Sequence, residues 1–247
     1  MTDDASKAAQ RFMKPELPKR FYKSAEAARE EDGYTVHLDG RPVRTPAKTP
    51  LNVPSEALAL ALAAEWNAQA EVIDPASMPL TRIVNSTIDG VARDVDAVRE
   101  EIVRYSGSDL ICYRADSPER LVERQRLNWD PILDWTSTEL GAEFLATEGI
   151  QFVEQPEASR EVIRATLSKL NEFQVAGLSV VTTLTGSALI ALAVLKGRLD
   201  SAEAWRLAHV DEDWNIELWG EDEEARKRGE GRAKEMEAAV RLIALTT

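Results

Sequence analysis

The sequence predicts an α+β fold, in which a small mixed α/β domain precedes an all-helical domain. The first third of the chain combines a strand-like alternation of apolar and polar residues with a helical segment. The sequence after residue 90 shows only the helical spacing of apolar residues. We therefore place the domains at residues 1–90 and 91–247, with residues 1–20 as a loose arm because prolines are scattered there among charges.

A hairpin is expected near the start of the first domain. Apolar residues alternate with polar ones over residues 34–38, as they do in a half-buried strand. Asp39-Gly40 supplies the positive φ angles of a tight turn, so residues 41–45 should return antiparallel. Pro42 would keep that second strand at a sheet edge or a bulge.

A helix should follow the hairpin and complete the first domain. Ser55 can cap a segment rich in Ala and Leu over residues 57–70. The next stretch, residues 73–82, contains two prolines, and we expect it to be extended or irregular.

The second domain is predicted to consist of helices. Apolar spacing indicates one-sided helices over residues 91–105, 118–140 and 162–173, and a long helical region over 201–245. Pro118 would occupy the first helical position, and Pro131 should kink or break its helix. We expect a small hairpin over residues 143–153 and a bend near Gly229 and Gly231.

One segment of the second domain resembles a membrane span in length. Residues 173–195 contain no charged side chain, and a stretch of that length can cross a bilayer. They include several Ser and Thr residues, however, and no basic or aromatic belt flanks them. We interpret the segment as one helix buried on nearly all sides, and we expect no stable membrane insertion.

Composition and motifs exclude several classes of function. The 43 acidic and 30 basic side chains give a net charge of −13, whereas a nucleic-acid binder needs a basic surface. One Cys and two His are too few for a zinc site, and Cys112, which follows two apolar residues, is interpreted as a buried structural thiol. The sequence has no Gly-rich phosphate loop and no serine-nucleophile motif. We therefore predict a protein that is not an enzyme and has no cofactor and no bound metal.

The most unusual local feature is a run of acids near the C-terminus. Residues 211–224 hold eight acidic side chains and no basic one. Four of them, spaced along one side of a helix, suit a solvated face. These four residues are Asp213, Glu217, Glu221 and Glu224.

Glu212 does not fit the description of a solvated face. On a continuous helix it would share a row with apolar residues, which are Trp205, Ala208, Ile216 and Trp219. A carboxylate in such a row is either paired with a base inside the protein or held for a cation on a partner. Exposed Trp side chains next to a charge are typical of interface anchors. Both interpretations of Glu212 stay open on the sequence alone.

Four ordered groups of residues together resemble one protein family, the assembly chaperones of the α subunit of the F-type ATP synthase catalytic head. The resemblance extends from Phe21 to the C-terminus, and no single motif carries it alone. The groups are Phe21-Tyr22-Lys23 with Gly33 to Pro46; Glu65-Trp66, Gln69, Ile73, Pro75, Met78-Pro79, Arg82 and Asn85; Asp109-Leu110, Cys112-Tyr113-Arg114, Gln125, Trp129, Pro131 and Trp135; and Asp211-Glu212, Trp214 and Trp219-Gly220.

The resemblance implies a chaperone that binds the unassembled α subunit and prevents its aggregation until β pairs with it. It also implies that an acidic residue in the C-terminal helices matters for this action. Glu212 is our candidate, Glu223 and Glu224 are alternatives, and Asp211, Trp205 and Trp219 complete the expected partner-binding group. The residues to which we assign structural roles are Trp66, Pro79, Arg82, Trp129 and Trp214.

The expected setting of this function is bacterial. The acidic N-terminus carries no export signal, so we expect a cytoplasmic protein. Eukaryotic relatives would act in the mitochondrial matrix. We also expect the protein to be a monomer. The alternative function is a carboxylate-based enzyme or a divalent-metal binder, because carboxylates can serve acid–base catalysis or ligate hard cations.

Overall fold

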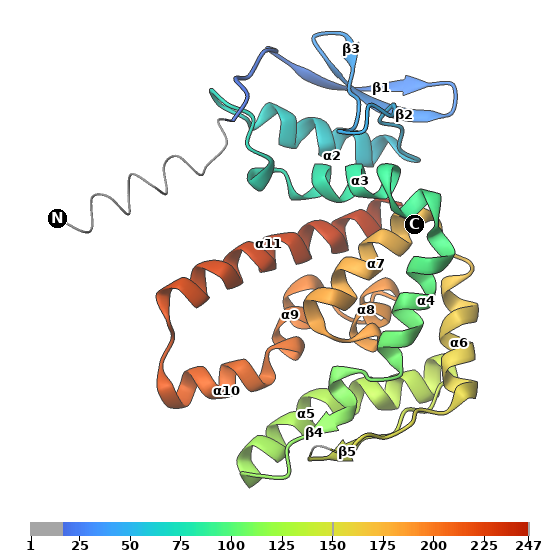
Figure 1. The fold of residues 1–247 in the computed structure, drawn as a ribbon, viewed down its shortest axis with the longest axis vertical. Coiled ribbons are helices and arrows are strands. Elements are labelled where there is room, and N and C mark those ends of the chain that lie inside the picture. Colours follow the sequence, from blue (N-terminus) through green and yellow to red (C-terminus); the bar gives the residue numbers. More distant parts are fainter. Residues whose placement is uncertain (1–16, 150, 247) are drawn as a thin grey trace, which may run out of the picture.

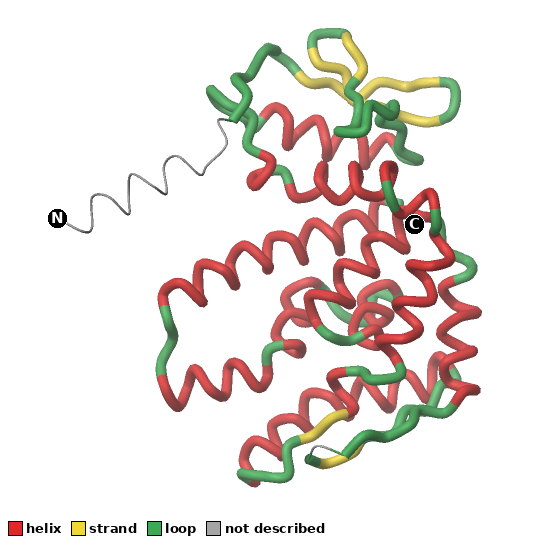
Figure 2. The backbone as a smooth tube through the Cα atoms, in the orientation of Figure 1, coloured by secondary structure: helices red, strands yellow, loops and turns green. Residues whose placement is uncertain are grey.

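A computed structural model describes residues 17–149 and 151–246 and confirms the α+β fold. A small sheet with two helices beneath it forms one end of the molecule, and the remaining helices extend away from it (Figure 1). Strand structure is concentrated in that end, apart from one short pair of strands at the other end (Figure 2).

The sheet is a three-stranded antiparallel meander in the order β1-β2-β3. Its strands are β1 (Ala25–Glu30), β2 (Gly33–Leu38) and β3 (Arg41–Pro42). The turn predicted at Asp39-Gly40 is present, and both residues have positive φ, at 48° and 80°. The hairpin therefore forms where the sequence places it.

Helix α2 (Glu56–Asn67) covers one face of the sheet. Ser55 caps it as predicted, because the Ser55 Oγ accepts a hydrogen bond from Leu58 N at 3.1 Å. At the other end of the helix, Asn67 binds both the N–H and the C=O of Ala25, at 2.8 and 2.7 Å. These two bonds fix the helix to the edge strand β1.

The stretch expected to be irregular, residues 73–82, is partly helical. A 3-10 turn (Pro75–Ser77) leads into α3 (Pro79–Asp89). Pro79 occupies the first turn, where its missing N–H removes no bond. The prediction was wrong over 79–82 because the cap of α3 comes from Glu65, a residue distant in sequence.

The uncharged segment forms two helices rather than one. Helix α7 (Glu172–Thr185) ends at Gly186, whose φ is +67°, and α8 (Ala188–Leu195) starts after Ser187. The Ser187 Oγ caps α8 by accepting a hydrogen bond from Ile190 N at 3.0 Å. Within the described part of the chain, no helix is long and apolar enough to cross a membrane.

Helices α7 and α8 lie at the centre of the helical region. Helix α4 (Val95–Ser106) packs on both, and α6 (Glu157–Leu167) packs on α4. At Gly177 the backbone of α7 approaches α11 so closely that an added Cβ would lie 2.7 Å from the Ile243 Cγ1. The absence of a side chain at this position therefore sets the separation of α7 and α11.

The structure shows no break at Pro131, and the hairpin expected over residues 143–153 was wrong for the described residues. Helix α5 (Glu119–Trp135) starts one residue after Pro118 and continues through Pro131, which is exposed to solvent. The described residues of the range 143–153 form no hairpin, because β5 (Thr147–Glu148) pairs in parallel with the distant β4 (Tyr113–Arg114). A π-helical turn (Thr136–Leu140) directly follows α5.

The C-terminal region consists of three helices, where the sequence predicted one bent helical region. They are α9 (Ser201–Ala208), α10 (Val210–Trp219) and α11 (Glu223–Leu245). The chain breaks at His209 and at Gly220, whose φ is +82°. Gly229 and Gly231, near which a bend was predicted, lie inside α11, and the helix is continuous across both positions.

Helix α11 joins the two ends of the molecule. It packs on α7 and α9 and also on α3 beneath the sheet. Arg82 of α3 pairs with Glu235 of α11 at 2.8 Å, and the Ser55 Oγ donates to Leu245 O at 2.6 Å.

Candidate functional site

An open groove lies between α10 and α11, with a volume of about 710 Å³. Helices α10 and α11 are joined by a short turn at one side of the molecule (Figure 1). The groove between them includes Gly220 of that turn and is open to solvent. Three of the predicted partner-binding residues line the groove, and these are Trp205, Glu212 and Trp219. The breaks at His209 and Gly220 therefore create the candidate site.

The inner end of the groove is built by Trp205 and His209. Their rings stack with centroids 3.8 Å apart, and the His209 Nδ1 lies 2.8 Å from Trp205 O. The Arg232 guanidinium lies 6.0 Å from the Trp205 ring centroid and donates to Leu184 O at 3.1 Å. These contacts hold the Trp205 ring in place against α11.

Glu212 is exposed and has no ion pair or hydrogen bond through its carboxylate with any described residue. The internal ion pair that the sequence allowed is therefore not seen. One and two turns further along α10 lie Ile216, 40% exposed, and Trp219, 84% exposed. A free carboxylate thus stands beside two exposed apolar side chains on one face of α10.

The other acids predicted to bind the partner, Asp211, Glu223 and Glu224, do not line the groove. The Asp211 Oδ1 accepts a hydrogen bond from the Gln125 Nε2 at 2.7 Å, which anchors α10 to α5. Arg124 of α5 pairs in the same way with Glu217, at 2.7 Å. Asp211 therefore belongs to the contact between α10 and α5.

Glu223 and Glu224 lie in the first turn of α11, outside the groove lining. They form ion pairs one turn along the helix with Lys227 at 2.7 Å and Arg228 at 3.7 Å. Acids in the first turn of a helix are also stabilised by its dipole. Of the alternatives for the important acid, Glu212 alone lines the groove.

The residues with predicted structural roles lie as follows. Trp129 is 1% exposed, and its Nε1 donates to Leu207 O at 2.7 Å. Trp66 is half-buried against the Tyr22 ring, with centroids 5.7 Å apart, whereas Trp214 is half-buried on α10. Pro79 starts α3, and Arg82 forms the ion pair with Glu235.

Sequence reasoning missed a buried carboxylate at the centre of the helical region. Asp109 is fully buried and accepts hydrogen bonds from Leu189 N at 3.0 Å and Ile111 N at 3.3 Å. Burial raises the pKa of Asp109 to about 6, and hydrogen bonds only partly oppose that rise. The motif around Asp109 was visible in the sequence, but its burial depends on the distant helix α8.

Cys112 lies beside this carboxylate and is buried. Burial first, and then the charge of Asp109, raise the pKa of Cys112 to about 12, so the thiol stays protonated near neutral pH. In the described part of the chain, no group of three His, Cys, Asp or Glu side chains is arranged to hold a metal ion.

Comparisons with known proteins agree on one family. Residues 19–137 match the family described as ATP12 chaperone protein. Atp12 from Paracoccus denitrificans, whose crystal structure is known, is 45% identical to this chain in sequence. The two structures align over 93% of this chain and 99% of the Paracoccus chain, with a TM-score of 0.88. The Atu1473 protein of Agrobacterium tumefaciens is 50% identical over 97% of this chain and 90% of its own, with a TM-score of 0.91. The mitochondrial protein atp12 of Schizosaccharomyces pombe is 25% identical over 233 residues, which are 90% of this chain and 80% of that protein.

Proposed function

This chain belongs to the ATP12 chaperone family of ATP synthase assembly chaperones, and from that premise we propose that it binds the unassembled α subunit of the F-type ATP synthase. In this proposal it keeps α from aggregating until the β subunit pairs with it. It acts as a single chain in the bacterial cytoplasm, without catalysing a reaction.

The observation that carries the proposal is the unpaired Glu212 beside the exposed Trp219 in the groove between α10 and α11. An exposed Trp and a charge in a hollow are the side-chain types that dominate the binding energy of interfaces. The Glu212 carboxylate is solvated in the free protein. Covering it therefore favours a client surface that brings a Lys or Arg among apolar side chains.

The mechanism we propose is stabilisation by mass action. A lone α subunit exposes the apolar surface that later faces β, and such surfaces associate. A protein that binds the folded form shifts the equilibrium away from aggregation. Charged contacts give fast and selective binding, so that β can displace the chaperone without an energy source.

Co-expression of α with Glu212→Lys tests the proposal. The fraction of α that stays soluble should fall to the level seen without the chaperone, because the reversed charge repels the client's cation. Glu224→Lys makes the same charge change on α11 outside the groove, and it should protect as well as wild type.

A pull-down without β provides the second arm of this test. The α subunit should be recovered with the wild-type chain and with Glu224→Lys, but not with Glu212→Lys. Recovery of α with a folded Glu212→Lys variant would remove Glu212 from the site. Failure of the wild-type chain to bind α would overturn the proposed function.

A further inference from the structure

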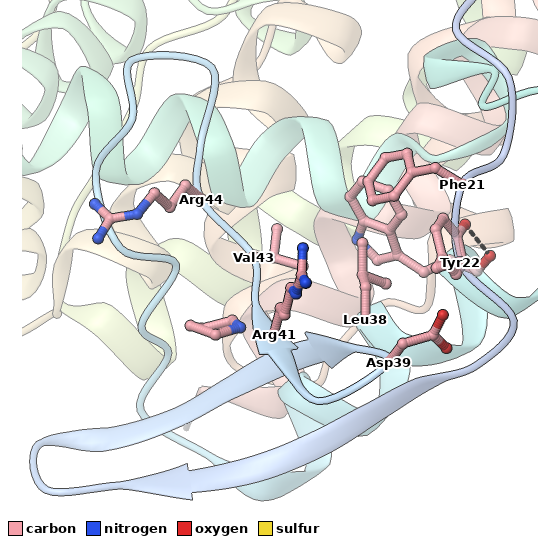
Figure 3. Close-up of a pocket in the computed structure, with 9 residues that line it drawn as sticks. Phe21, Tyr22, Leu38, Asp39, Arg41, Val43 and Arg44 are labelled. Atoms are coloured by element: carbon pink, nitrogen blue, oxygen red, sulfur yellow. Dashed lines mark hydrogen bonds between the residues drawn. The ribbon is translucent and has the colours of Figure 1, made fainter.

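A second hollow, of about 560 Å³, lies beside the sheet. The sheet forms one end of the molecule, and helix α10 lies away from that end (Figure 1). The hollow is enclosed by the segment before β1, the end of β2, strand β3 and helix α2 (Figure 3). Its lining residues are Phe21, Tyr22, Leu38, Asp39, Arg41, Pro42, Val43, Arg44 and Trp66. We call this hollow the sheet-end pocket.

One wall of the sheet-end pocket is aromatic and held in place. The Tyr22 ring packs edge-on against Phe21 and Trp66, with centroids 5.4 and 5.7 Å apart, and the Tyr22 hydroxyl donates to Trp66 O at 2.7 Å (Figure 3). The outer ring, Phe21, is nonetheless 74% exposed. A fixed and uncovered aromatic side chain at the mouth of a hollow is typical of an interface anchor.

The charged groups of the sheet-end pocket leave a positive balance. The Asp39 carboxylate is already satisfied, because it accepts hydrogen bonds from Lys23 N and Ser24 N, each at 3.0 Å. Arg41 is exposed and has no ion pair or hydrogen bond through its side chain with any described residue. Figure 3 shows its side chain extending upward beside Val43.

Arg44 stands at the rim of the same pocket and points away from Phe21 and Tyr22 (Figure 3). Its Nη1 donates to Lys48 O at 2.9 Å, and it forms no ion pair with the described residues. The sheet-end pocket therefore offers cationic donors but no free carboxylate of its own.

The backbone of this sheet edge is not open to an added strand. Pro42 has no N–H to donate, Val43 N donates to Val36 O at 2.9 Å, and Leu51 N donates to Val43 O at 3.2 Å. A ligand of the sheet-end pocket would thus be recognised by its side chains. The complementary chemistry is a carboxylate for Arg41 next to an aromatic or branched aliphatic side chain for Phe21.

We propose that the sheet-end pocket is a second docking site for the client, which inserts an acidic side chain and its apolar neighbour against Arg41 and Phe21. This inference rests on the proposed function, because it takes the α subunit as the occupant. The two sites carry opposite charges, basic at the sheet-end pocket and acidic at the α10–α11 groove, and this difference fixes one orientation of the client.

The test measures the affinity of the full-length chain for purified α subunit at low and high salt. Arg41→Glu should weaken binding by about tenfold or more, and its remaining affinity should depend less on salt than that of wild type. Phe21→Ser should weaken binding similarly without changing the salt dependence. Arg29→Glu makes the same charge change on β1 outside the pocket, and it should bind within about twofold of wild type.

Each outcome separates the inference from the proposed function. If wild type binds α and the folded Arg41→Glu and Phe21→Ser variants bind equally well, the sheet-end pocket is not a docking site and the proposed function stands. If wild type does not bind α, both fall. If Arg41→Glu binds α as well as wild type but no longer binds vesicles that contain phosphatidylglycerol, the pocket serves an anionic membrane surface and the inference is overturned.

Discussion

Glu65 caps helix α3 through Thr81: its Oε2 accepts hydrogen bonds from the backbone N and the Oγ1 of Thr81, both at 2.7 Å. Its other oxygen accepts from Leu80 N at 2.9 Å. The N-cap residue of α3, Met78, has no side-chain oxygen that could take this role. One carboxylate in the last turn of α2 therefore satisfies two backbone donors of α3 and places a negative charge at its N-terminus.

The first prediction concerns this cap. Glu65→Ala should lower the free energy of unfolding by about 1–3 kcal/mol, because two partly buried N–H groups and a hydroxyl lose their acceptor. Urea denaturation measures the change. Glu71→Ala removes an exposed Glu from the following loop and should change stability by less than about 0.5 kcal/mol. Equal stability of the two variants would contradict this role of Glu65.

The same contact shows where sequence reasoning ends. The turn at Asp39-Gly40 could be predicted because its positive φ angles are a local requirement of those two residues. The start of α3 could not, since its cap is Glu65 of the preceding helix α2, 15 residues before Leu80. The break at Gly186-Ser187 carried a local signal, a Gly followed by a capping Ser, but the absence of charge across the segment concealed it.

The candidate site was predictable only in part. Glu212 could be identified because a carboxylate among Trp and Ile residues is unusual on any helix. Which of the neighbouring acids lie outside the groove depended on the helix breaks at His209 and Gly220. After these breaks Asp211 contacts α5, and Glu223 starts a new helix. Gly220, whose φ is +82°, carried a local signal for the second break, whereas His209 is not a residue type that usually ends a helix.

The second prediction concerns the contact between α7 and α11. Gly177→Val should lower the free energy of unfolding by about 3 kcal/mol, because its Cβ would lie 2.7 Å from the Ile243 Cγ1 and 3.0 Å from Ala239 O. Thermal and urea denaturation both measure this. Gly231→Val, in α11, is the control, because no atom lies within 4 Å of its added Cβ. A Gly177→Val protein as stable as this control would show that the helices can separate without cost.

The third prediction is a pH dependence that originates at Asp109. Its pKa in the folded state, about 6, lies above the ordinary pKa of 3.8 for an Asp side chain, so the folded state binds the proton more tightly than the unfolded state. The stability this provides is complete below pH 4 and is lost as pH rises through 6. The free energy of unfolding of wild type relative to Asp109→Asn should therefore fall between pH 4.5 and 7, by on the order of 2 kcal/mol.

Urea titrations of the two proteins across that pH range measure the difference. Other carboxylates titrate in both proteins, so their contributions cancel in the comparison. Asn at this position keeps one acceptor oxygen but cannot accept from both Leu189 N and Ile111 N, so the variant should be less stable at acidic pH. A difference that stays constant with pH would contradict a raised pKa at Asp109.

The fourth prediction separates binding from stability with two tryptophans. Trp219 is 84% exposed, so Trp219→Ala should leave the free energy of unfolding within about 0.5 kcal/mol of wild type. Trp129 is 1% exposed and donates from its Nε1 to Leu207 O, so Trp129→Phe should cost about 2–3 kcal/mol by leaving that buried carbonyl without its donor.

In the α pull-down, at a temperature where both variants are folded, the variant with the larger effect should be Trp219→Ala instead of Trp129→Phe. Trp219→Ala should lose most of the recovered α, because the groove loses its exposed anchor, whereas Trp129→Phe should recover as much as wild type. Full recovery of α by a folded Trp219→Ala protein would move the client contact away from the groove between α10 and α11.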